Sequence, residues 1–358
     1  MSFEVLEKKF SILFPQRVDQ KLREEMRAKL RERSSYVDII LFSSGTTSGA
    51  TVKGYGLSFE ALFSNAKAVN EHLGLDSRER WGLTLPSEHI GGLSVWARAK
   101  LSGSQVFEWK RPWNPHVWSH FIEQFQVTVT SLVPTQVFDL VHQKIQCPKC
   151  LSKVIVGGDY LSQSLHQNAL KLGWPLLRTF GMTELCSQVA TEKEVSLQQR
   201  LIPLSIHQLA IVENVLCVTD SKSLVSEKYL FSKGRLEVKE ITRPFLTSDR
   251  VELRDGFLFH KGRTDRVIKM NGRLVDLDEL NFKLYSLSDQ IGIKKCFYLR
   301  SLESERAGKV LELMHLPNVS NKHIEAALKV LRPFKVDQLT SVSNFHFTEL
   351  GKLRDKNL

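Results

Sequence analysis

A run of small residues between a buried strand and a helix limits most strongly what this chain can fold into. Residues 36–42 read YVDIILF, and their β-branched side chains predict a buried strand. Residues 43–56 then read SSGTTSGATVKGYG, and Ser58 is suited to the N-cap of a helix over residues 58–73. Because a strand and a helix flank the segment so closely, a flexible linker is a poor interpretation. The order of strand, small-residue loop and helix predicts a phosphate-binding turn.

The residue types of the loop suit this chemistry. Phosphate oxygens need many short-range donors, which hydroxyls and backbone amides supply, while glycines let the backbone approach closely. Lys53 adds a point charge. The pattern is not the Walker sequence GxxxxGK[ST]. The candidate phosphate contacts are Ser43, Ser44, Gly45, Thr46, Thr47 and Lys53.

Strands and helices alternate after this loop as far as about residue 181, which predicts a layered α/β domain with a mostly parallel sheet. After about residue 200, short strands separated by turns predict a β-rich subdomain. From Val267 onward strands and helices mix again, which predicts a small α+β C-terminal domain joined by a hinge. We place the boundary near residues 262–265, giving an N-terminal domain over 1–264 and a C-terminal domain over 265–358.

The net charge of the chain favours some classes of binding partner but does not identify one. The chain has 50 Lys+Arg against 39 Asp+Glu, a formal charge of +11, which favours an anionic partner such as nucleic acid, a membrane surface or a polyphosphate. No helix-turn-helix, RRM or zinc-knuckle signature supports nucleic acid. No window approaches the ~20 apolar residues of a membrane span. No secretory signal is present either, so we expect a cytoplasmic protein.

The five cysteines do not predict a disulfide framework or a zinc site. Their number is odd, and they are sparse for a long chain. Cys147 and Cys150 form one CxxC, but a structural zinc site would need two more ligands at similar spacing. Two reduced thiols on a loop are the better interpretation.

Five further motifs follow the loop in order. They are HIGG at residues 89–92, FGMTE at 180–184, TSD at 247–249, GRTDRVIK at 262–269 with Gly272 and Glu279 after it, and GKLR at 351–354. Together with the loop they resemble the adenylate-forming superfamily of acyl-CoA synthetases, luciferases and peptide-synthetase adenylation domains, over roughly residues 40–358. The loop departs from the family form [ST]SGTTGxPKG by two extra residues before Lys53 and by the missing proline. The role of Lys53 therefore stays open.

The resemblance implies ATP, Mg²⁺ and CoA as ligands and gives the matching residues their expected roles. Phe180 would stack on adenine, Gly157 and Gly158 would let the backbone approach the base, and Asp249 would accept from the ribose hydroxyls. Arg263 would donate to ribose or phosphate, Thr183 to the α-phosphate, and Glu184 would bind Mg²⁺. The resemblance makes Lys352 the catalytic bridge between substrate carboxylate and α-phosphate, and Asp265 the hinge. His89 would line the acyl and CoA entry.

Two stretches resemble the o-succinylbenzoate–CoA ligases of menaquinone biosynthesis more closely. They are HIGGLSVWARAK at residues 89–100 and FGMTELCSQVAT at 180–191. o-Succinylbenzoate is an aromatic dicarboxylate, and the carboxylate that does not react needs polar or charged side chains beside it in the pocket. Arg98 is the candidate partner, although a surface arginine is nearly as good an interpretation. Ser94, Ser187 and Gln188 are weaker candidates.

The expected activity is therefore an AMP-forming acid–thiol ligase, with o-succinylbenzoate as the preferred acid. A CoA ligase for another aryl or short acyl acid, a nucleotide-binding pseudo-enzyme and a nucleic-acid-binding protein remain as alternatives. About 40 residues precede the loop, fewer than in most relatives. We therefore expect a shortened N-terminal part, whose acyl pocket is either more open or closed by a partner. A homodimer is left open.

Overall fold

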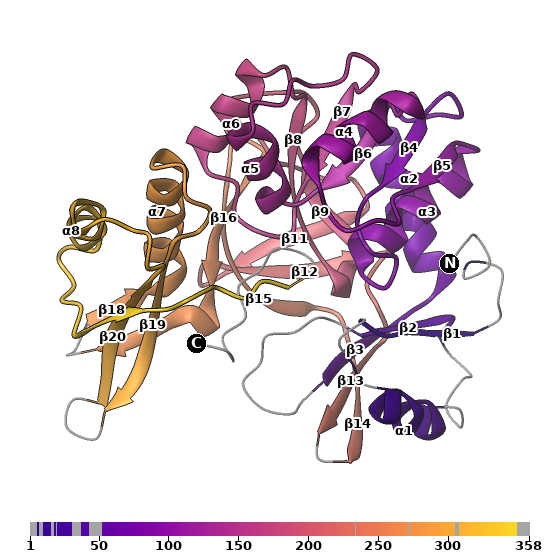
Figure 1. Cartoon of the computed structure of the whole chain (residues 1–358). Helices are drawn as coiled ribbons and strands as arrows, with labels where there is room; N and C mark the ends of the chain where they lie inside the picture. The colour runs from indigo at the N-terminus through magenta and orange to yellow at the C-terminus, as the bar shows by residue number, and fades with distance from the viewer. Residues whose placement is uncertain are drawn as a thin grey trace.

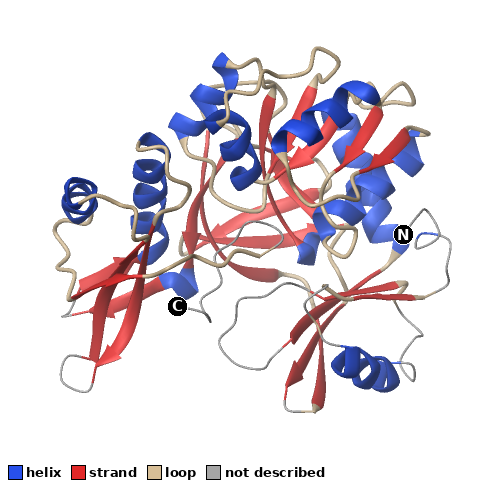
Figure 2. Cartoon of the chain, viewed as in Figure 1, coloured by secondary structure: helices blue, strands red, loops and turns tan. Residues whose placement is uncertain are grey.

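The computed structural model describes residues 6, 10–15, 18, 20–30, 37–42, 52–232, 234–270, 273–304 and 308–348. Figure 1 shows a central body of strands and helices, a smaller sheet beside helix α1, and a C-terminal unit on the other side. Figure 2 shows the same view by secondary structure. The predicted phosphate contacts Ser43, Ser44, Gly45, Thr46 and Thr47, together with Lys352, lie outside the described residues.

The central body is built on a seven-stranded sheet. Its strand order is β10-β9-β8-β7-β6-β4-β5, and the five strands from β8 to β5 are parallel. This confirms the α/β class and the mostly parallel sheet. The strands are β4 (Arg80–Leu83), β5 (Gln105–Glu108), β6 (Val129–Leu132), β7 (Lys153–Val156), β8 (Leu176–Met182), β9 (Ser187–Thr191) and β10 (Ile202–Pro203).

Helices cover both faces of this sheet because successive strand side chains point to opposite faces. Ile155 and Leu177 pack with α2 (Phe59–Leu73) and α3 (Ile90–Ser102). Their neighbours Val154 and Leu176 pack into the opposite cluster. That cluster lies under α4 (Pro115–Gln124), α5 (Pro134–His142) and α6 (Gln163–Lys171). The alternating pattern predicted this layering, although α5 itself was not foreseen.

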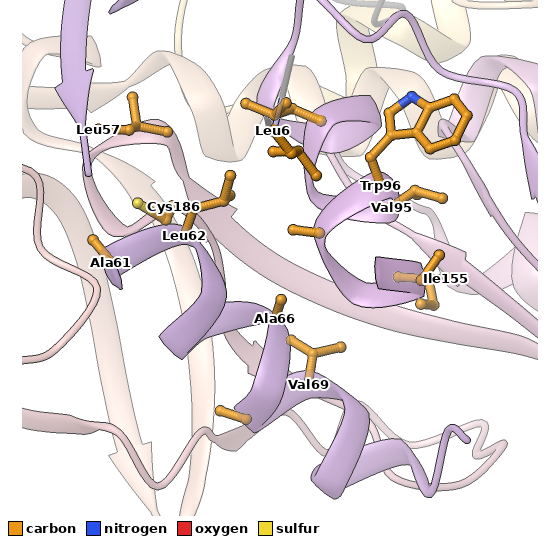
Figure 3. Packing of buried hydrophobic residues seen from close by; sticks show 14 of the residues in the cluster. Leu6, Leu57, Ala61, Leu62, Ala66, Val69, Val95, Trp96, Ile155 and Cys186 are labelled. Atoms are coloured by element: carbon orange, nitrogen blue, oxygen red, sulfur yellow. The ribbon is translucent and has the colours of Figure 1, made fainter. Parts of the chain in front are cut away.

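Figure 3 shows the core between α2 and α3, where Leu62, Ala66 and Val69 approach Val95 and Trp96. Helix α2 begins as predicted, because the Ser58 Oγ accepts a hydrogen bond from the Ala61 amide at 3.1 Å. Burying these apolar side chains contributes roughly 1.5–3 kcal/mol each for the larger ones.

A second sheet joins distant parts of the chain. Its order is β1-β2-β3-β13-β14, in which β3 pairs antiparallel with β13. Helix α1 supplies Met26 and Leu30 to the core below it. The elements are β1 (Ser11–Leu13), α1 (Gln20–Leu30), β2 (Ile39–Phe42), β3 (Val52–Leu57), β13 (Glu227–Ser232) and β14 (Arg235–Glu240).

The predicted β-rich subdomain is present as a four-stranded antiparallel sheet of order β11-β12-β15-β16. Its strands are β11 (His207–Val212), β12 (Val215–Ser221), β15 (Phe245–Arg254) and β16 (Phe257–Arg263). Its core includes Leu185 and Val189, so the subdomain packs directly against the end of the central sheet.

The C-terminal unit has a core of its own, which includes Phe297, Leu311 and Leu313. The predicted boundary falls in the 3₁₀ turn η4 (Thr264–Arg266), between β16 and β17. The elements are β17 (Val267–Met270), β18 (Arg273–Asp276), α7 (Leu277–Gln290), β19 (Phe297–Ser304), β20 (Gly308–His315), α8 (Asn321–Val330) and β21 (Gln338–Ser341).

Charged contacts fix the C-terminal unit on the helical layer of the central body. Lys294 Nζ lies 3.0 and 2.9 Å from the two carboxylate oxygens of Asp139, and Lys295 pairs with Asp159.

Among the helices of the described residues, none combines the length and apolarity needed to cross a membrane.

Asp289 of α7 lies half-buried at the contact of the C-terminal unit with the central body, and it makes docking sensitive to pH. Ser162 Oγ donates to Asp289 Oδ2 at 2.5 Å, and burial raises the pKa of Asp289 to about 6. Because the folded state holds this proton more tightly than the unfolded chain, the contribution of Asp289 to stability is fully present below about pH 4 and is lost as pH rises through 6. Asp289→Asn should remove this fall, a difference on the order of 2–3 kcal/mol in unfolding free energy.

Urea unfolding of the wild type and of Asp289→Asn between pH 4 and pH 8 measures this difference. The exposed Asp255→Asn is the control and should parallel the wild type. Parallel curves for Asp289→Asn would contradict the assignment.

Candidate functional site

The candidate site lies where the parallel strands β7 and β8 end. Gly157 and Gly158 follow β7, and the segment from Phe180 to Glu184 completes β8 and enters the turn η3 (Thr183–Leu185). In open α/β sheets, ligands bind outside the carboxyl ends of the strands. Gly158 has φ +86°, a conformation that favours glycine. A Cβ at Gly157 would meet the Thr179 side chain at 2.7 Å.

The chain reverses between β8 and β9 in a tight turn that we call the β8–β9 corner, residues 183–188. Cys186 has φ +55° and Ser187 has φ +130°, both unusual for residues other than glycine. A Cβ at Gly181 would lie 2.0 Å from the Ser187 carbonyl oxygen, so only glycine allows this approach. Cys186 is fully buried in the core of Figure 3, and burial raises the pKa of its thiol. The strained conformation is therefore fixed by packing.

Two buried side chains hold the corner from behind. Asn65 of α2 donates its Nδ2 to the carbonyls of Leu185 at 3.0 Å and of Gln188 at 2.8 Å. His207 Nε2 lies 3.1 Å from the same Gln188 carbonyl. Burial lowers the pKa of His207 to about 4, so the ring is neutral at physiological pH. The corner is thus tied to a helix on one side and to the β-rich subdomain on the other.

A phenylalanine, a histidine and a carboxylate contact one another in series at the end of the site. The rings of Phe180 and His260 stack at 4.9 Å between centroids, with 28° between their planes. His260 Nε2 lies 2.9 Å from Asp249 Oδ1. The ring of Phe180 is therefore linked to the predicted Asp249 through His260. His260 was not foreseen.

Arg263 extends this cluster to the predicted hinge. Its Nη1 lies 3.5 Å from Asp249 Oδ2. Its Nε and Nη2 donate to the two oxygens of Asp265 at 3.0 and 2.9 Å. The hydrogen bonds to Asp265 raise the pKa of Arg263. The arginine and the two aspartates therefore form one charged cluster at the junction with the C-terminal unit.

Glu184 is held by Tyr55, at the end of the segment 43–56 that the sequence predicted as a loop; the structure instead places residues 52–57 in strand β3, because they pair with β2 and β13. Tyr55 of β3 donates its hydroxyl to Glu184 Oε1 at 2.6 Å. Burial, followed by the nearby carboxylate, raises the pKa of Tyr55. Thr183 adjoins Glu184 in η3 and is partly exposed. Lys53 lies two residues before Tyr55 at the start of β3.

A buried arginine occupies the other end of the corner. Arg98 of α3 is 1% exposed and donates its Nη2 to Ser187 Oγ at 3.1 Å. Ser187 Oγ in turn bonds to Ser94 Oγ at 3.3 Å. Among the described residues, no carboxylate pairs with Arg98, and its Nε has no hydrogen-bond partner. Burial lowers the pKa of Arg98 to about 9. The surface interpretation of this arginine is wrong.

The remaining predicted residues are placed as follows. His89 caps the N-terminal end of α3 by position and is 3% exposed. Gly92 is needed there, since a Cβ would lie 2.2 Å from the Pro86 carbonyl oxygen. The Gln188 side chain accepts a hydrogen bond from Thr191 at 2.5 Å, which gives it a structural partner. Tyr55, Asn65, His207 and His260 carry no motif, and only their tertiary contacts bring them to the site.

The carboxylate of Glu184 is a chemically suitable ligand for a magnesium ion. Mg²⁺ in nucleotide sites takes one or two carboxylates and several phosphate or water oxygens. Over the described part of the chain, no three His, Cys, Asp or Glu side chains gather as a complete metal site. A cation at Glu184 would therefore depend on oxygens from a bound ligand.

Comparisons with known proteins agree with this geometry. The family "AMP-binding enzyme" matches residues 12–214, more than half of the chain. Curated 2-succinylbenzoate–CoA ligases from Staphylococcus aureus strains MRSA252 and MSSA476 are 35% identical over 161 residues. That alignment covers 45% of this chain and 32% of each relative.

Solved structures resemble the whole fold. One is o-succinylbenzoate–CoA synthetase from Bacillus subtilis in complex with the acyl-adenylate intermediate, with a TM-score of 0.74 at 20% identity. The match covers 98% of this chain and 78% of that one. The same enzyme with ATP and magnesium ion has a TM-score of 0.74 at 20% identity, covering 99% of this chain and 80% of that one.

The tight approach at Gly181 predicts a large cost for any side chain there. Gly181→Ala should lower the free energy of unfolding by about 3 kcal/mol or more, because the clash is with backbone. Gly103→Ala is the matched control. Gly103 has φ +71° but its nearest obstacle is 3.8 Å away, so it should lose only about 1 kcal/mol. Denaturant unfolding of both variants measures this, and equal losses would refute the role of the close approach.

Proposed function

The chain belongs to the AMP-binding enzyme family, and we propose that it is an acid–thiol ligase that forms AMP. The acid we propose is o-succinylbenzoate. In the first step a carboxylate oxygen bonds to the α-phosphorus of ATP, and pyrophosphate leaves. In the second step the CoA sulfur bonds to the acyl carbon, the acyl–oxygen bond breaks, and AMP leaves.

The residues at the ends of β7 and β8 would bind the nucleotide. Phe180 offers a face for adenine, and Asp249 offers carboxylate oxygens for the ribose hydroxyls. Arg263 brings a cation to the ribose or phosphates, and Thr183 brings a hydroxyl donor. Mg²⁺ bound through Glu184 would supply charge neutralisation for the phosphates. This arrangement would preorganise positive charge where the transition state accumulates negative charge.

The observation that carries the substrate assignment is the buried Arg98 guanidinium. A charged side chain taken out of water without a counter-ion costs folding free energy. A substrate carboxylate beside it would recover that cost upon binding. Arg98 lies on the helix that His89 begins, and Ser187 links it to the corner that carries Glu184. A dicarboxylic acid, with one group for adenylation and one for Arg98, fits this layout. An acid without a second carboxylate leaves the guanidinium unpaired.

A panel of acids tests the proposal. Purified protein with Mg-ATP should release pyrophosphate with o-succinylbenzoate, and should give its CoA thioester when CoA is added. Benzoate and short monocarboxylates should be poor substrates. Release with a different acid only would refute the substrate assignment, and no release with any acid would refute the ligase assignment.

The variant Arg98→Met tests whether Arg98 binds the second carboxylate of the acid. It should lower kcat/KM for o-succinylbenzoate roughly 100-fold, because it removes one partner of a buried charge pair. Arg98→Lys should be intermediate, since it keeps the charge but loses the fork of donors. Neither should lower the melting temperature, because the wild-type guanidinium is itself costly to bury. Lys100→Met on the exposed face of α3 is the control. An unchanged kcat/KM in Arg98→Met would contradict the role of Arg98.

Lys352 should separate the two half-reactions. A lysine at this position would bridge the substrate carboxylate and the α-phosphate, where negative charge accumulates. Lys352→Ala should therefore lower adenylate formation by a factor of roughly 100 or more, and lower thioester formation from pre-made adenylate much less. Quenched-flow measurement of each half-reaction checks this. Equal losses in both would reject the assignment.

A further inference from the structure

Tyr55 connects two parts of the molecule that are far apart in sequence. It lies on β3, in the sheet formed with β13, and is 6% exposed. Its hydroxyl reaches the β8–β9 corner and donates to Glu184 Oε1 at 2.6 Å. Two residues earlier in the same strand is Lys53. The strand that leaves the phosphate loop therefore contacts the carboxylate predicted to bind the cation.

The backbone around Glu184 is already fixed without the tyrosine. The Val225 amide donates to the Glu184 carbonyl at 3.0 Å. The Asn65 amide group holds the carbonyls of Leu185 and Gln188 on the next residues of the corner. What these bonds leave undetermined is the direction of the Glu184 side chain, which has three rotatable bonds. A glutamate that moves among rotamers loses conformational entropy when it binds a cation.

We propose that Tyr55 is a positioning residue for the metal ligand Glu184, an inference that rests on the proposed function. The hydroxyl occupies Oε1 and leaves Oε2 as the oxygen that binds the cation. Because the donor is on β3, the orientation of the carboxylate is coupled to the strand that follows the phosphate loop. Tyr55 touches neither nucleotide nor acid in this arrangement, and it acts through Glu184.

The surroundings of Tyr55 support positioning over a purely packing role. A buried phenol in a core needs a hydrogen-bond partner, but a backbone carbonyl would satisfy it. Here the partner is a carboxylate, and hydrogen bonds to charged groups are stronger than neutral ones. Arg263 brings a positive charge to the same neighbourhood from the side of the junction, and the Glu184 carboxylate is one of the groups that raise the pKa of this arginine. The hydrogen bond from Tyr55 thus orients the carboxylate, as a metal ligand needs to be.

The test is Tyr55→Phe, which removes one oxygen and keeps the ring. Binding of ATP is measured by calorimetry at increasing Mg²⁺ concentrations and also without Mg²⁺. We expect the Mg²⁺ concentration for half-maximal effect to rise about tenfold, which corresponds to loss of one charged hydrogen bond. Binding of ATP without Mg²⁺ should be unchanged. An unchanged Mg²⁺ requirement would overturn the proposal.

Tyr229→Phe is the matched control. Tyr229 is a buried tyrosine of β13 in the same sheet, and its hydroxyl donates to the carboxylate of Glu227, away from the site. Its Mg²⁺ requirement should match the wild type. A tenfold rise in Tyr229→Phe as well would show a general effect of the sheet and would overturn the proposal.

A second measurement does not depend on folding of the phenylalanine variant. 3-Fluorotyrosine placed at position 55 reports its surroundings by fluorine NMR. Adding Mg²⁺ to the ATP-bound protein should shift this resonance, and Glu184→Gln should abolish the shift. No shift with Glu184 intact would overturn the proposal. Neither binding nor NMR requires turnover, so a protein that releases no pyrophosphate would refute the proposed function and still leave Tyr55 testable.

Discussion

The reversal of the chain between β8 and β9 is the constraint on which the rest of the site depends. Within six residues it turns from Thr183 and Glu184 to Ser187, and it uses two positive φ angles to do so. Such a turn is stable only where the surroundings fix it. Gly181 lets the two strands approach, Cys186 anchors the turn in the core, and Asn65 binds the carbonyls on either side.

The corner divides the polar groups of the site into two ends with different electrostatics. At one end Arg263 is neutralised by Asp249 and Asp265, so a ligand arriving there exchanges partners. At the other end Arg98 is buried without a counter-ion among the described residues. Guanidinium groups are costly to bury alone, and this cost favours a ligand that brings its own anion. One end of the corner therefore lies near an arginine that is paired with carboxylates, Arg263, and the other end lies near a buried arginine without a counter-ion, Arg98.

The C-terminal unit meets the central body through charged contacts and through a small aromatic cluster, in which the rings of Tyr160 and Phe282 stack at 4.4 Å between centroids. Lys294 pairs with Asp139 of α5, Lys295 pairs with Asp159 in the loop before α6, and the half-buried Asp289 accepts a hydrogen bond from Ser162. The unit also has a separate apolar core. The charged contacts are more sensitive to pH and salt than a shared apolar core would be.

The sequence by itself determined the α/β class, the parallel sheet, the helix starting at Ser58 and the motifs around Phe180, Asp249 and Arg263, because local periodicity and short motifs carry that information. Only the tertiary structure decided that Arg98 is buried rather than exposed, since every residue of its helix from Gly92 to Ala99 is buried. It also decided that Tyr55 meets Glu184, although 129 residues separate them. Hydrogen bonds between distant strands depend on sheet order and register, and neither is encoded in the spacing of residues along the chain.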